Sequence, residues 1–198
     1  MKVVVKRSKP ETSEAEVLTV PVWQGTALPT ASAAAQLDAH LEGLISEYLG
    51  TGDFPGTLNS TMLLRPRGGI TAPRLLLVGL GKSDAFSVDH LRQASASAAT
   101  TVRKLGASTM AIVPPPGELS AAVVGQAITE GALLGLYTLK KYKTVQEDGP
   151  PDNLQELQIL ANGSSTQQTL AKGVERGRIL AEAVALARDL INSPGNEV

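Results

Sequence analysis

Short apolar runs alternate along the chain with longer segments in which apolar side chains recur every three or four residues. The short runs, rich in aliphatic and β-branched residues, predict strands, over residues 2–7, 16–22, 57–65, 74–80, 109–113 and 154–160. The segments of helical periodicity predict helices, over about 32–49, 88–105, 119–142 and 167–192. Strands that alternate with helices in this way are typical of α/β proteins.

The centre of the chain gives the clearest indication of strand direction. Residues 74–80 are almost continuously apolar, as expected of a strand buried on both faces. Ser87 is a good cap for the next helix, and Gly106 ends that helix just before strand 109–113. Connections this short imply a crossover between parallel strands.

We therefore predict a three-layer α/β fold with a mixed, largely parallel sheet between helices. This domain is expected to cover residues 1–165, and residues 166–198 are expected to form a linking helix and a turn. The helix ends in Asn192-Ser-Pro-Gly-Asn196, a sequence that redirects the backbone shortly before the last residue. We expect from this that the chain is part of a longer protein.

Composition excludes several classes of function. Lys plus Arg number 18 and Asp plus Glu number 19, so the net charge of −1 does not favour nucleic acid or a membrane surface as the main partner. Cysteine is absent, which excludes disulfides, thiolate zinc sites and a cysteine nucleophile. The sequence holds no secretory or membrane-spanning apolar segment, so we expect a cytoplasmic location.

The segment from Gly79 to Ser83 is the only candidate for a phosphate-binding loop. A Walker loop would need glycine at Leu76, and a dinucleotide-binding fingerprint would need glycine at Asp84. Because both templates fail, we interpret the segment as a tight turn from strand to helix. Binding of an anion at the start of the next helix remains an open alternative.

No other residue pattern identifies a catalytic, cofactor-binding or metal-ligating site. His40 and His90 lack a partner at the spacing of a metal-ligand pair, although sequence order does not exclude a site assembled in space. A basic face for nucleic acid would require several separated cations to gather, namely Arg65, Arg67, Arg103, Lys104, Lys140, Lys141 and Lys143. The simpler interpretation of the cations at helix ends is that they complement the helix dipole.

Three segments together resemble the N-terminal domain of the leucyl (cytosol) aminopeptidase family. They are residues 74–82, residues 130–137 with Lys141-Tyr-Lys143, and residues 187–196, and residues 52–56 extend the resemblance. The resemblance implies a macro-domain-like fold for residues 1 to about 165, and a bridge from the last helix to a C-terminal catalytic domain. In this family that later domain binds two divalent metals, Zn or Mn, through Asp, Glu and Lys side chains. It releases N-terminal amino acids from peptides.

The resemblance also implies what this chain does. No catalytic residue, cofactor-binding residue or metal ligand can be assigned to any of its positions, so the chain alone should be inactive. Its role would be to support the hexamer typical of the family and to shape access to the active sites. An exposed apolar stripe on the last helix would normally face the catalytic domain. The alternative is a free-standing macro-like module that binds ADP-ribose or nucleic acid.

Overall fold

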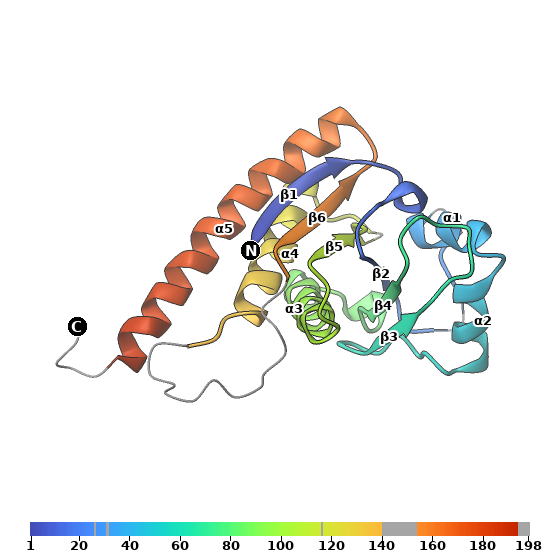
Figure 1. The fold of residues 1–198 in the computed structure, drawn as a ribbon, viewed down its shortest axis with the longest axis horizontal. Helices are drawn as coiled ribbons and strands as arrows, with labels where there is room; N and C mark the ends of the chain where they lie inside the picture. Colours follow the sequence, from blue (N-terminus) through green and yellow to red (C-terminus); the bar gives the residue numbers. More distant parts are fainter. Residues whose placement is uncertain (26, 31, 116, 140–153, 194–198) are drawn as a thin grey trace.

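A six-stranded sheet organises the described part of the protein (Figure 1). The structure is a computed structural model and describes residues 1–25, 27–30, 32–115, 117–139 and 154–193. The sheet has the order β1-β6-β5-β2-β4-β3. Its strands are β1 (Lys2–Arg7), β2 (Val17–Val22), β3 (Thr61–Leu64), β4 (Leu75–Gly79), β5 (Thr109–Ile112) and β6 (Glu156–Ala161). Only β3 runs antiparallel to its neighbour among these strands, which confirms the prediction of a mixed, largely parallel sheet.

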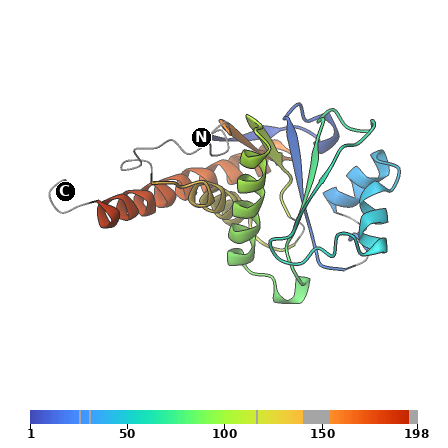
Figure 2. The same cartoon turned by 60° about the horizontal axis from the view of Figure 1, so that its bottom comes forward.

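Helices cover both faces of the sheet, so the predicted three layers are confirmed (Figures 1 and 2). The α-helices are α1 (Ala33–His40), α2 (Leu44–Thr51), α3 (Val88–Lys104), α4 (Ala121–Gly135) and α5 (Ser164–Asn192). Successive residues of β4 point to opposite faces. Leu76 and Val78 join the core under α3, α4 and α5, whereas Leu75 and Leu77 join the core under α1 and α2.

The predicted parallel crossover from β4 through α3 to β5 is confirmed, with one difference in the sheet order. β2 lies between the two strands and pairs in parallel with both. β1 and β6 pair in parallel at one edge, although they come from opposite ends of the chain.

The predicted single helix over 32–49 is wrong, because the chain forms two helices there. Glu42 and Gly43 have φ of 55° and 87°, so the backbone leaves the right-handed helical region between α1 and α2. The buried carboxylate of Asp38 accepts the N–H of Ile45 at 2.7 Å and so caps the second helix. Gly50, expected to end the helix, lies inside α2.

Two other predicted boundaries also change. Strand 57–65 shortens to β3 because Asn59 adopts φ of 67° and residues 56–60 turn back over the end of β4. The helix expected over 119–142 ends at Gly135, and the N–H of Tyr137 then donates to the carbonyl of Leu134 at 3.3 Å. Residues 140–142 of that prediction lie outside the described residues.

Glycines allow α3, α4 and α5 to pack at unusually short range. A Cβ atom at Gly125 of α4 would lie 2.5 Å from the carbonyl oxygen of Leu170 in α5. One at Gly135 would lie 2.7 Å from the Cβ atom of Ala96 in α3. Larger residues would therefore force these helices apart. Within the described residues, no helix combines the length and the apolar character needed to cross a membrane.

Candidate functional site

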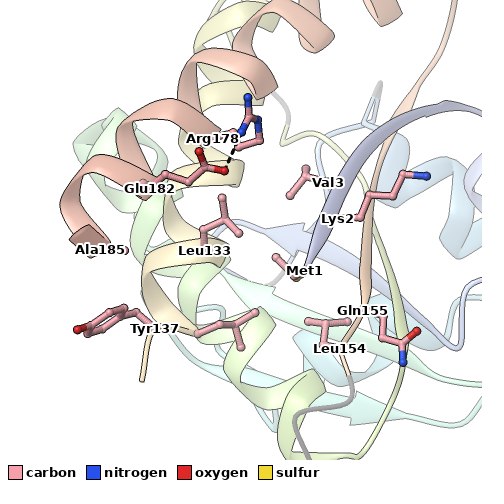
Figure 3. A pocket seen from close by; sticks show the side chains of 12 residues that line it. Met1, Lys2, Val3, Leu133, Tyr137, Leu154, Gln155, Arg178, Glu182 and Ala185 are labelled. Atoms are coloured by element: carbon pink, nitrogen blue, oxygen red, sulfur yellow. Dashed lines mark hydrogen bonds and ion pairs between the residues drawn. The ribbon is translucent and has the colours of Figure 1, made fainter. Parts of the chain in front are cut away.

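A groove of about 690 Å³ lies between α5, the end of α4 and the start of β1 (Figure 3). Its lining is mainly apolar, from Met1, Val3, Leu133, Leu136, Tyr137, Leu154, Ala181 and Ala185. Lys2, Gln155, Arg178 and Glu182 add polar groups at its edges. A concave, mostly apolar surface with a few polar groups is the usual form of a binding site.

The groove exists because α5 extends beyond the domain that supports its first half (Figures 1 and 2). Leu170, Val174 and Ala181 are buried against the domain, as predicted. Val184 and Ile191, also predicted to be buried, are 39% and 82% exposed. That part of the prediction is wrong, because no described element covers the last turns of α5.

Six large apolar side chains make the second half of α5 an exposed apolar stripe. They are Ile179, Leu180, Val184, Leu186, Leu190 and Ile191. Single apolar residues on a surface are ordinary, but a contiguous set marks an interaction site. The expectation of an exposed apolar stripe on the last helix is thereby confirmed.

Polar contacts fix one end of the groove. The hydroxyl of Tyr137 donates a hydrogen bond of 2.7 Å to Oδ1 of Asp189, and this bond raises the pKa of Tyr137. The guanidinium of Arg188 lies 5.4 Å from the centre of the Tyr137 ring, within range of a cation–π interaction. These contacts tie the distal part of α5 to the segment that follows α4.

A second polar group lies on α5 beside the groove. Arg178 donates hydrogen bonds of 2.7 Å to both Glu175 and Glu182, which raises the pKa of Arg178 and lowers that of Glu175. All three side chains are substantially exposed, so their ion pairs add little to stability. The two ion pairs fix the orientation of the Arg178 side chain along α5.

The glycine-rich segment after β4 is a closed structural turn. The N–H groups of Gly79, Leu80 and Gly81 donate to the carbonyls of Ser60, Val22 and Gly56, at 2.8, 2.9 and 3.1 Å. These three donors are therefore not available to a phosphate. The interpretation of a tight turn from strand to helix is supported.

The candidate charged residues are not brought together. Arg103 donates to the carbonyl of Leu136 on the α3–α4 side of the sheet, whereas Arg65 and Arg67 lie beside His40 at the end of α1, on the other side. Lys140, Lys141 and Lys143 lie outside the described residues. The described cations thus do not form the single face that a nucleic-acid interface would need.

The described side chains do not fit a two-metal centre. His40 has its Nε2 atom 3.9 Å from Glu11, and His90 lies in the first turn of α3. Among the residues that the structure describes, no group of three or more His, Asp or Glu side chains could hold a metal ion.

The sequence predicts the apolar stripe but not the groove, whose lining contains none of the six stripe residues. Met1, Val3, Leu133 and Tyr137 all line the groove, and nothing in the local pattern of these residues indicates that they share it.

Comparison with known proteins gives a consistent result. The model of the cytosol aminopeptidase family, N-terminal domain, matches residues 19–146. A probable cytosol aminopeptidase of Alkaliphilus metalliredigens (strain QYMF) is 40% identical over 162 residues, which are 81% of this chain and 32% of the relative. Another, from Roseiflexus castenholzii (strain DSM 13941 / HLO8), is 32% identical over 199 residues and covers 100% of this chain and 38% of the relative. The chain thus spans about a third of the length of these curated relatives.

Solved structures show the same fold at lower identity. A tomato leucine aminopeptidase mutant aligns with a TM-score of 0.78 at 23% identity, over 100% of this chain and 39% of the other. The bottromycin maturation enzyme BotP in complex with Mn aligns with a TM-score of 0.60 at 24% identity, over 91% of this chain and 32% of the other.

Proposed function

The chain belongs to the cytosol aminopeptidase family, of which it carries the N-terminal domain, and from this premise we propose that it is the non-catalytic part of a metal-dependent leucyl aminopeptidase. The observation that carries the proposal is the family match over residues 19–146, together with relatives of which the chain spans only 32% and 38%. The whole enzyme would release N-terminal amino acids from peptides in the cytoplasm, in keeping with the name of its relatives.

We propose that the chemistry resides in the part of the relatives that extends beyond this chain. Two divalent metals, Mn or Zn, would there polarise the scissile carbonyl and activate water. Support for a metal comes from the family and from BotP, whose structure is described as a complex with Mn. The described side chains of this chain offer no matching ligand set.

The proposed division of the chain rests on its packing. Residues 1–165 would form the macro-like domain, and residues 166–198 the link to the catalytic domain. The exposed apolar stripe of α5 would pack against that domain, which would cover side chains such as Leu186 and Ile191. By holding the two parts together, the chain would support hexamer assembly and shape access to the active sites.

The test is a hydrolysis assay with the purified 198-residue chain. Leucine p-nitroanilide and leucine amide would be offered with added Mn²⁺ or Zn²⁺, and a mock purification would serve as the background. We expect no hydrolysis above that background. Metal-dependent release of leucine by the pure chain would contradict the proposal.

A further inference from the structure

A second hollow, of about 350 Å³, lies where the end of α1 meets the loop between β3 and β4. Its lining includes His40, Arg65, Arg67, Gly68 and Gly69. We propose that this hollow binds the phosphate group of a small phosphate monoester. The site is separate from the groove under α5 and is independent of the proposed peptidase role.

Charge is the first reason. Arg65 and Arg67 both line the hollow, and neither forms an ion pair within the part of the chain that the structure describes. The carboxylates nearby are Glu42, which also lines the hollow, and Glu11, which lies 3.9 Å from Nε2 of His40. Two guanidinium groups therefore face one lining carboxylate, which leaves the hollow favourable for an anion.

The backbone of the loop adds further donors. Gly68 and Gly69 have φ of 129° and 77°, a backbone conformation that glycine adopts readily. Within the described residues, no backbone carbonyl accepts the N–H of either glycine. A Cβ atom at Gly69 would overlap the carbonyl oxygen of His40, so this loop lies directly on the end of α1. The two glycines line the hollow together with the two arginines.

The number of donors favours phosphate over a carboxylate. Two guanidinium forks and two backbone N–H groups exceed what the two oxygens of a carboxylate can accept. A phosphate monoester offers three acceptor oxygens and a charge of about −1.5 to −2 at neutral pH, which matches two arginines. A hollow of 350 Å³ is at the small end of ligand sites and leaves room for a small organic group.

The experiment follows the ring resonances of His40 and His90 by NMR while inorganic phosphate or phenyl phosphate is added. The two histidines are the only ones in the chain, and a His90→Gln variant assigns them. His90 lies in the first turn of α3 on the other face of the sheet, so its resonance reports separately on an anion at that helix start. We expect a saturable shift of His40, with tighter binding of phenyl phosphate than of inorganic phosphate.

Variants separate this site from a general effect of anions. Arg67→Gln and Arg65→Gln should each weaken binding about tenfold or more, whereas Arg176→Gln, an equal charge change on exposed α5, should not. Glu42→Gln should tighten binding, because it removes the lining carboxylate. Two results would each overturn the proposal: no saturable shift of His40, or binding at His40 that survives both arginine variants. A short oligonucleotide that binds while the monoesters do not would also overturn it.

Discussion

At the residue scale, glycines decide how closely the helices pack. Gly173 lies where α5 crosses α4, and a methyl group there would overlap the carbonyl oxygen of Ala122. We expect Gly173→Ala to lower the free energy of unfolding by about 1–3 kcal/mol, since the helices must separate. Gly50 is the control: it lies inside α2, and a Cβ atom added there would have no neighbour within 4 Å, so Gly50→Ala should raise stability by about 0.5–1 kcal/mol. Urea unfolding measures both, and equal effects would contradict this account.

These two glycines also show what single residues reveal before the structure is known. The sequence suggested that Gly50 ends a helix, because glycine is common at that position. The structure places it inside α2, and its surroundings are open. Gly173 is likewise a glycine within a predicted helix. Its importance depends on Ala122, about fifty residues earlier in the chain. Long-range contacts of this kind are invisible to local pattern.

At the scale of elements, Glu16 joins the starts of three strands. Its Oε1 atom accepts the N–H of Ser108 at 3.0 Å and also the Ser108 hydroxyl, and its Oε2 atom accepts Nη2 of Arg74 at 2.9 Å. β2, β4 and β5 begin beside these residues. The hydrogen bonds from Ser108, with the charge of Arg74, hold the pKa of Glu16 below its ordinary value.

This pKa shift predicts a pH dependence of stability. A carboxylate with a lowered pKa in the folded state stabilises the protein above its unfolded pKa, about 4.3, and loses that contribution as the pH falls through the folded value. Glu16→Gln should therefore be less stable than the parent at pH 7, and the difference should shrink in acid. Urea unfolding from pH 7 to pH 3 measures it, with exposed Glu14→Gln as the control. A difference that is constant with pH would contradict the assignment.

The elements themselves were largely predictable, and the errors have local causes. Strands such as β4 were found because aliphatic runs bounded by turns are distinctive. The periodicity of residues 32–49 continues through the break between α1 and α2, because both helices pack on the same core. The break depends on Asp38 folding its carboxylate onto Ile45, a contact that periodicity does not encode. The pairing of β1 with β6 was likewise beyond local pattern.

At the scale of the whole molecule, α5 stands out because the described residues leave large apolar side chains of its second half exposed. The absence of assigned catalytic or metal residues in this chain stays a prediction, whereas the exposed stripe was predicted and observed. The groove could not be predicted, because it needs Met1, Leu133 and Ala181 to meet from three separate elements. The second half of α5 projects away from the sheet and the other helices (Figure 2).

The stripe predicts how the isolated chain behaves in solution. Leu186 and Ile191 are 60% and 82% exposed, and apolar area of this kind is removed from water by any surface that covers it. We expect the chain to associate as its concentration rises, and the double variant Leu186→Ser with Ile191→Ser to remain monomeric in sedimentation velocity. Its unfolding midpoint should barely change, because exposed side chains contribute little to folding. Arg176→Ser, on the same helix, should associate like the parent. A parent chain that stays monomeric at all concentrations would show that this stripe is not an interaction surface by itself.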